Sequence, residues 1–370
     1  MILRTFGWAF GITVLGLLVA ALYDGGTGLA LVAVLAVLEI SLSFDNAVVN
    51  AKVLDRMSPF WQKIFLTIGI AIAVFGMRLV FPLLIVGITA KLNPVEAFDL
   101  ALNDPHKYHH LMNDAYPMIA AFGGMFLLML FLDFVFEERA DKWLPWLEAP
   151  LARIGKLDQL SVVVAGGALA FTAGLFAEDP GKVMIAGVLG MVTYILVNGL
   201  GELFSEATDD DEDEDGEDGE ERAPARSGPS SLALATGKAG FFLFLYLEVL
   251  DASFSFDGVI GAFAISTDPI IIALGLGIGA MYIRSLTVFL VRKGTLHEYI
   301  YLEHGAHWAI GALAVCMLVS IGRHVPEWLT GGVGAGLIIA AFISSVVRNR
   351  AGGGPAAAAG DDQPLHSSKV

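Results

Sequence analysis

Two stretches of this chain place acidic, amide and hydroxyl side chains inside otherwise apolar sequence. The first is 38-LEISLSFDNAVV-49 and the second is 247-LEVLDASFSFDGVI-260. Their polar groups are the acids Glu39, Asp45, Glu248, Asp251 and Asp257, the amide Asn46, and the hydroxyls Ser41, Ser43, Ser253 and Ser255. Oxygen ligands of these kinds suit hard divalent cations such as Mn²⁺, Mg²⁺ and Ca²⁺. The repeated motif therefore predicts a cation site assembled from two parts of the chain.

The composition shows which solvent surrounds these motifs. Of the 370 residues, 56% are hydrophobic and 16% are charged, and the mean hydropathy is +0.69. Soluble domains carry about a quarter charged residues, so we predict an all-α polytopic membrane protein. Runs long enough to cross a bilayer predict ten spans, near residues 5–22, 28–51, 64–90, 115–136, 159–177, 182–204, 238–265, 270–291, 305–322 and 327–347. The third and seventh runs are long, which predicts tilt or a break.

A strongly acidic segment divides the chain. Residues 209–221 contain eleven acids in thirteen positions, so we predict a disordered cytoplasmic loop over 205–237. This leaves a first membrane half over 1–204 with six helices, a second over 238–347 with four, and a flexible tail over 348–370. The single cysteine, Cys316, allows no internal disulfide.

The distribution of basic residues predicts the orientation. With the N-terminus inside, sixteen of the 22 Lys and Arg residues fall in inner segments. Four fall in outer loops, and the remaining two, Arg78 and Arg284, lie within predicted spans. We therefore expect a multi-pass protein of the bacterial plasma membrane with both termini in the cytoplasm.

In this orientation the two motifs run in opposite directions across the membrane. The first lies on a span that runs from outside to inside, and the second on a span that runs from inside to outside. The span after each motif carries one arginine, Arg78 or Arg284. Inverted repeats that meet near the bilayer midplane are a recurring transporter architecture, so the pattern predicts an inverted-topology repeat.

The two motifs also carry a family resemblance. The E-x5-D-N pattern of the first motif, the D-x-x-F-S-x-D pattern of the second, and the later arginines resemble the TerC family of integral membrane proteins. More closely, 120-AAFGGMFLLMLFLDF-134 and 299-YIYLEHGAHWAIGALA-314 resemble a bacterial branch of that superfamily known only as a domain of unknown function. The resemblance implies a fold related to LysE-type exporters, a role in metal-ion homeostasis with manganese efflux as the best candidate, and a link to tellurite resistance. The family often has a small polar residue after the second aspartate, where this chain has Gly258.

Charge balance supports a cation site independently. Five acids and two arginines inside spans leave three negative charges uncompensated, which is costly at bilayer depth. A divalent cation would reduce the excess to one, and protons could remove the rest. We assign metal contact to Glu39, Asp45, Asn46, Asp251, Asp257, Ser43 and Ser255, and charge pairing or gating to Arg78, Arg284 and Glu248.

Spacing limits how these acids can act together. On a regular helix Glu39 and Asp45 project about 120° apart, and so do Asp251 and Asp257. Either the helices break near the serines, or the first acid of each motif pairs with an arginine while the second binds the ion. We favour the second interpretation. A third is that the charges only hold the bundle together through salt bridges.

Other functions remain as alternatives. A non-transporting membrane partner in metallation or in metal and tellurite stress could use the same cation site. An intramembrane aspartyl protease would also need two aspartates, but the G-x-G-D sequence of such enzymes is absent. There is no P-loop. We therefore expect no enzyme activity, no permanently bound cofactor and no nucleic-acid partner; the expected contacts are the lipid bilayer, a divalent cation and protons.

Overall fold

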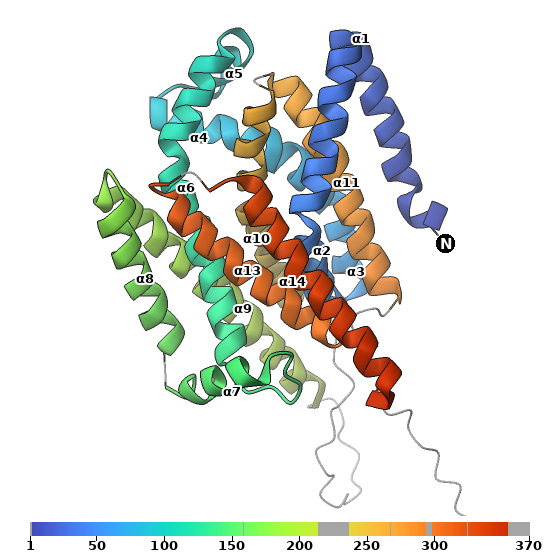
Figure 1. Ribbon diagram of the computed structural model, residues 1–370, viewed down its shortest axis with the longest axis vertical. Coiled ribbons are helices and arrows are strands. Elements are labelled where there is room, and N and C mark those ends of the chain that lie inside the picture. The colour runs from blue at the N-terminus through green and yellow to red at the C-terminus, as the bar shows by residue number, and fades with distance from the viewer. Residues whose placement is uncertain are drawn as a thin grey trace, which may run out of the picture.

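The computed structural model describes residues 2–157, 159–213, 237–266, 268–293, 298–323 and 325–353. All regular elements within these ranges are helices, so the predicted all-α class is confirmed (Figure 1). Residues 214–236 of the predicted acidic loop and 354–370 of the predicted tail lie outside the described residues.

The first element, α1 (Ile2–Leu42), is two helical arms joined by a tight turn. Asp24 and Gly25 leave helical geometry, and Gly25 has a φ of 62°, which glycine adopts without steric cost. Figure 1 shows the two arms lying antiparallel. The break falls between the predicted spans 5–22 and 28–51. The chain bends again at Ser43, which separates α1 from α2 (Phe44–Asp55).

The predicted third span changes between α-helical and π-helical geometry, but no non-helical residue interrupts it. It consists of α3 (Pro59–Ile64), the π-helical turns η1 (Phe65–Gly69) and η2 (Ile72–Val80), and α4 (Phe81–Ala90). π-helical turns are rare and often occur at functional sites, because the wider turn displaces side chains and carbonyl groups from their regular positions. The predicted seventh span, in contrast, is the continuous helix α10 (Gly237–Ile265).

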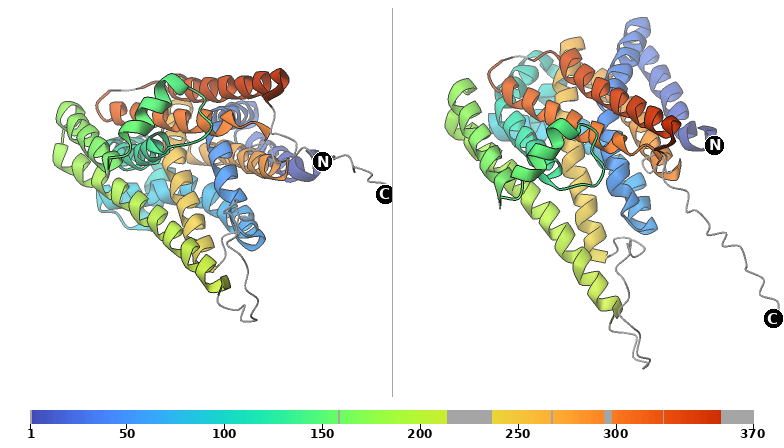
Figure 2. Two further views of the ribbon diagram at one scale, coloured as in Figure 1. Left: turned by 90° about the horizontal axis from the view of Figure 1, so that it is seen from below. Right: turned by 60° about the horizontal axis from the view of Figure 1, so that its bottom comes forward.

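The middle of the chain contains two short helices that the hydropathy pattern does not predict. They are α5 (Pro94–Asn103), which begins with a capping box between Asn93 and Glu96, and α7 (Pro145–Ile154). The long helix α6 (Pro105–Phe136) begins ten residues before its predicted span. Next come α8 (Leu160–Phe176) and α9 (Pro180–Asp213). Figure 2 shows the end of α9 extending past the neighbouring helices.

The helix α9 therefore includes the first nine residues of the predicted acidic loop, 205–213. Extending an existing helix costs much less than starting one, which accounts for the helix running beyond its apolar part. After α10 follow α11 (Pro269–Lys293), α13 (Tyr301–Ser320), α14 (Glu327–Arg348) and η3 (Asn349–Gly353).

Within the described residues, seven helical stretches are long and apolar enough to cross a membrane. They are Thr5–Ile40, Pro59–Gly76, Pro105–Phe136, Pro180–Leu200, Pro269–Val291, Tyr301–Ser320 and Leu329–Ala351. This number makes the chain a multi-pass membrane protein. It differs from the predicted ten for three reasons. The two arms of α1 form one stretch, α8 has only 17 residues, and α10 carries acids along its length.

The helix α10 lies where the hydrophobic clusters of the protein meet. Its Leu250 packs in the large cluster around α6 and α13, while its Val259 packs in the cluster around α1 and α11. Its Leu247 packs with Phe65 of η1 in a third cluster. Polar side chains on α10 are therefore enclosed by helices from both halves of the chain.

Candidate cation site

The carboxylate of Asp251, on α10, is the centre of a buried polar cluster. Asn46 and Asn50, one turn apart on α2, donate to its Oδ1, the latter over 3.3 Å. Arg284, on α11, donates to its Oδ2 over 2.5 Å. The four residues are at most 7% exposed. This cluster joins three helices at positions far apart in the sequence.

The Arg284 guanidinium has further neighbours on the π-helical turn η1 of the third span. It stacks 3.8 Å from the ring centre of Phe65 and donates to the Gly69 carbonyl oxygen over 3.4 Å. Its Nη2 also lies 3.8 Å from Oε1 of Glu248, which precedes Asp251 by one turn of α10. One arginine therefore faces two acids, which leaves one negative charge without a compensating charge in this cluster.

Several buried oxygens of this region accept no hydrogen bond from any described residue. They are both carboxylate oxygens of Glu248, Oδ1 of Asn50 and Oγ of Ser255. Leaving a buried polar atom unpaired costs about 1–3 kcal/mol, and more for a charged one. A bound cation would supply the missing positive partner.

The first acid of the first motif, Glu39, occupies a separate place about two turns further along α10. It is 1% exposed and accepts a hydrogen bond of 2.9 Å from Ser43. A Cβ atom at Gly258 would lie 2.9 Å from Glu39 Oε2, and one at Gly279 would lie 2.5 Å from Glu39 Cβ. The glycine at position 258 thus makes room for Glu39, which explains why this chain lacks the expected polar side chain there.

The structure places only part of the predicted site. It brings Asn46, Asp251, Glu248 and Arg284 together, whereas Glu39 and Ser43 form a second group. Ser253 donates to the carbonyl of Val249 instead of reaching another helix.

The side chains of Asp45, Asp257, Arg78 and Ser41 lie outside those that the structure describes. No group of three or more His, Cys, Asp or Glu side chains in the described part of the chain is arranged to hold a metal.

The local backbone geometry differs between the two motifs. At the first motif the helix bends at Ser43, while the main-chain hydrogen bonds from Ser43 to Glu39 and from Ala47 to Ser43 persist at 2.9 and 3.3 Å. At the second motif α10 is unbroken, and its first acid, Asp251, pairs with Arg284. The two motifs are therefore not equivalent in structure.

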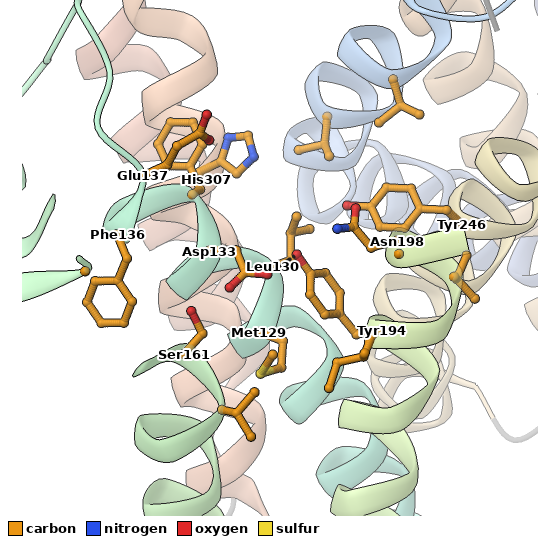
Figure 3. Close-up of a pocket in the computed structure, with 18 of the residues that line it drawn as sticks. Met129, Leu130, Asp133, Phe136, Glu137, Ser161, Tyr194, Asn198, Tyr246 and His307 are labelled. Atoms are coloured by element: carbon orange, nitrogen blue, oxygen red, sulfur yellow. Dashed lines mark hydrogen bonds between the residues drawn. The ribbon is translucent and has the colours of Figure 1, made fainter. Parts of the chain in front are cut away.

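A cavity of about 730 Å³ opens close to this cluster (Figure 3). Its lining comes from α2, α6, α8, α9, α10 and α13, and includes Val49, Asp133 and Tyr194. Val49 is one helical turn from Asn46, so the cavity approaches the cluster along α2. Tyr194 donates to Asp133 over 2.7 Å. The cavity is lined by both polar and apolar side chains, and none of Asn46, Asn50, Asp251 and Arg284 is among them.

At this cavity one carboxylate pairs with two basic side chains. Glu303, on α13, accepts from Lys52 of α2 at 2.9 Å and from Arg139 at 3.2 Å. Lys52, Arg139, Glu303 and the neighbouring His307 all line the cavity. Because Lys52 and Asn46 belong to the same short helix, this ion pair connects the position of α2 to that of α13.

Sequence reasoning missed two parts of the polar structure. Asn50 was detectable as a second amide four residues after Asn46 on the same helical face. The second part is Glu148 of α7, whose Oε1 bonds His304 at 3.1 Å and Trp308 at 3.0 Å. No local pattern marks this contact, because 156 residues separate Glu148 from His304.

Two histidines near the start of α6 contact residues of the same helix. His109 meets Asn113 and His110 meets Asp114, each four residues further along. Among the described residues, these histidines belong to no group of His, Cys, Asp or Glu that could hold a metal.

The fold and the cluster define a multi-pass, all-helical membrane protein with charged and amide side chains buried between α2, α10 and α11. The chain belongs to the family described as "Protein of unknown function (DUF475)", whose model matches residues 44–352. The match includes Asn46, Asn50 and the whole second motif, but it begins after Glu39. No curated protein and no solved structure matches the chain significantly.

Proposed function

We propose that the protein is a secondary transporter that exports a divalent cation, manganese, through the buried site in exchange for protons. One observation carries the proposal: Glu248 and Asp251 share the single cation Arg284, and both oxygens of Glu248 accept no hydrogen bond from a described residue. Ionisable side chains at bilayer depth are expensive and face partners, water or an ion. A transported cation is the partner that this cluster lacks.

The site would also draw on side chains that the structure does not describe. We assign Asp45 and Asp257 as ligands from the other half of each motif, with Arg78 as the charge partner of the first. Glu39, Ser43 and Ser255 would complete the oxygen set at neighbouring levels of α10. The cavity beside α2 would connect this region to one side of the membrane.

The proposed architecture is an inverted repeat of ten spans. Counting the two arms of α1 separately and adding α8 and α10 to the seven apolar stretches gives this number. In Figure 1, α2 leads toward the side of the molecule where α7 lies, and α10 leads away from it. This opposite course supports the antiparallel placement of the two motifs, with both termini on the cytoplasmic side of a bacterial plasma membrane.

The choice of manganese and of export rests on the resemblance to the TerC family. Oxygen ligands favour hard cations as a class, and Mn²⁺, Mg²⁺ and Ca²⁺ differ mainly in preferred distance and dehydration cost. Proton exchange follows from chemistry, because carboxylates that release a cation inside the bilayer are less costly when they take up a proton.

The test is transport by the purified protein in liposomes that contain a pH-sensitive dye. Mn²⁺, Mg²⁺ and Ca²⁺ are tested in turn, with protein-free liposomes as the blank. We expect Mn²⁺ movement with an opposing proton signal, and loss of both in Asp45→Asn and in Asp257→Asn.

Each result has a distinct meaning. Movement of none of the three cations would reject transport and favour a non-transporting role in metallation or metal stress. Metal movement without a proton signal would reject antiport, and preference for Mg²⁺ or Ca²⁺ would reject manganese. Wild-type flux in both aspartate variants would show that the ion passes elsewhere.

A further inference from the structure

The two acids of the buried cluster differ in what surrounds them. Both oxygens of Asp251 are occupied, Oδ1 by the amides of Asn46 and Asn50 and Oδ2 by Arg284. These three donors come from two helices, and they fix the carboxylate between α2 and α11. Asp251 therefore has the contacts of a residue that positions other groups.

Glu248 has the opposite surroundings. It is 5% exposed, so water does not solvate it, and no described residue donates a hydrogen bond to either oxygen. Its nearest described cation, Nη2 of Arg284, is 3.8 Å away and lies 2.5 Å from Asp251. When Glu248 is ionised, the uncompensated negative charge of the cluster therefore belongs to it.

Asn50 adds a second acceptor of the same kind. Its Nδ2 donates to Asp251, which holds the amide against the acid pair. Its Oδ1 is buried and accepts no hydrogen bond within the described part of the chain. Amide and carboxylate oxygens are both ligands that hard divalent cations accept.

The π-helical turn η1 of the third span lies against Glu248. Gly69 is the last residue of the π-helical turn η1, and a Cβ atom there would lie 2.6 Å from Glu248 Oε1. A side chain at position 69 would displace this carboxylate oxygen. The Gly69 carbonyl accepts a long contact of 3.4 Å from Arg284, so it faces the same cluster.

From these contacts we propose that Glu248 and Asn50 are the cation ligands at this level of the site, beside Gly69, and that Asp251 is a positioning residue. The inference rests on the proposed function for its ligand, a hard divalent cation. It exchanges the roles predicted from the sequence, which gave metal contact to Asp251 and charge pairing to Glu248. It also adds Asn50, which the sequence prediction omitted.

The test measures cation binding apart from transport. The full-length protein in detergent is heated with and without MnCl₂, because a ligand that binds only the folded state raises the melting temperature. We expect the rise for wild type and its loss in Glu248→Gln, which removes the charge but keeps the size of the side chain. Asn50→Leu should weaken Mn²⁺ binding about tenfold or more.

Two further variants separate the roles. Glu148→Gln makes the same change at another buried glutamate outside the cluster, and it should keep the full Mn²⁺-dependent rise. Asp251→Asn should melt earlier without metal, yet keep a Mn²⁺-dependent rise. Should it not fold, Glu248→Gln and Asn50→Leu still decide the assignment.

The outcomes distinguish this inference from the proposed function. Wild-type Mn²⁺ binding in Glu248→Gln, or no Mn²⁺ binding in the wild type, would overturn the assignment. A wild type that binds Mn²⁺ and loses binding in Glu248→Gln, but moves no cation in liposomes, would support the site and reject transport.

Discussion

Arg284 Nη2 lies 2.5 Å from Asp251 Oδ2, and the two side chains are 3% and 10% exposed. This contact joins α10 to α11 inside the bundle. Since Asn46 and Asn50 bind the same carboxylate from α2, the ion pair also sets where α2 packs. The pair therefore has a structural role whether or not a cation is bound nearby.

Removal of the arginine alone should be strongly destabilising. Arg284→Met leaves Asp251 and Glu248 buried without a cation, and breaking a buried pair in this way costs about 3–5 kcal/mol. The double variant Asp251→Leu/Arg284→Met removes both charges and should recover much of that loss. Melting temperatures in detergent measure both effects.

A surface pair provides the control for this prediction. Arg348 contacts Asp141 at 3.3 Å, and the side chains are 34% and 55% exposed. Arg348→Met should change stability by less than about 1 kcal/mol. Equal losses in Arg284→Met and Arg348→Met would contradict a buried structural role for Arg284.

Glycines on α11 allow α1 to approach closely, and their positions give a second prediction. A Cβ atom at Gly279 would lie 2.5 Å from Glu39 Cβ, and one at Gly275 would lie 2.4 Å from Leu35 Cβ. Small residues four apart are a common way for membrane helices to pack closely. Gly279→Ala should therefore cost about 1–3 kcal/mol by overpacking and should displace Glu39.

The residue between them is the matched control. A Cβ atom at Gly277 would meet Val74 Cγ1 at 3.4 Å, which is an ordinary contact. Gly277→Ala should leave the melting temperature nearly unchanged or raise it, because alanine favours the helix by about 1 kcal/mol. An equal loss in both variants would show that helix approach is not the cause.

Much of the fold followed from hydropathy. The predicted spans 238–265, 270–291 and 327–347 end within two residues of α10, α11 and α14. A long apolar run gives a strong signal because it must fill the bilayer. The short helices α5 and α7 and the π-helical turns gave no such signal, since capping and tertiary packing determine them.

The sequence predicted which residue types form the site, but not which acid pairs with the arginine. The motifs identified Asn46, Asp251 and Arg284, and the charge count indicated that an arginine must face an acid. Which acid keeps a free carboxylate depends on where α2 and η1 approach α10. That approach depends on the bend at Ser43 and on the glycine at position 69, and neither can be derived from helical periodicity.

The attachment of α7 predicts how stability depends on pH. Burial raises the pKa of the Glu148 carboxyl, but hydrogen bonds from His304 and Trp308 outweigh it, so the pKa lies below the usual range of a glutamate. Oε2 also accepts from the Trp143 main chain at 3.0 Å. A depressed folded-state pKa stabilises the protein above the unfolded-state pKa, and this stability is lost as the pH falls through the folded-state pKa.

We therefore expect the melting temperature to fall as the pH is lowered below about 5. The fall should be less steep in Glu148→Gln. The variant should melt earlier than wild type at neutral pH, because it lacks the charge-assisted hydrogen bonds. Asp141→Asn, at an exposed carboxylate, is the control and should follow the wild-type curve. Identical slopes for wild type and Glu148→Gln would refute the role of Glu148.

Labelling at the two ends of α8 tests whether this short helix crosses the membrane. α8 has 17 residues, which at 1.5 Å each is about 25 Å, the short limit for a membrane span. Lys156 precedes the helix and Lys182 follows it, with side chains 66% and 67% exposed. They form a matched pair, because each lysine contacts one exposed carboxylate, on Glu138 or Asp179.

After Cys316→Ala removes the only native thiol, Lys156→Cys and Lys182→Cys are each labelled in intact cells with a membrane-impermeant maleimide. If α8 spans the membrane with the predicted orientation, the thiol at 182 reacts from outside and the thiol at 156 reacts only after the cells are opened. Reaction of both from one side would show that α8 does not cross, and the predicted ten spans would be wrong. The reverse pattern would keep the span but invert the protein, because the positive-inside rule would then fail for this chain.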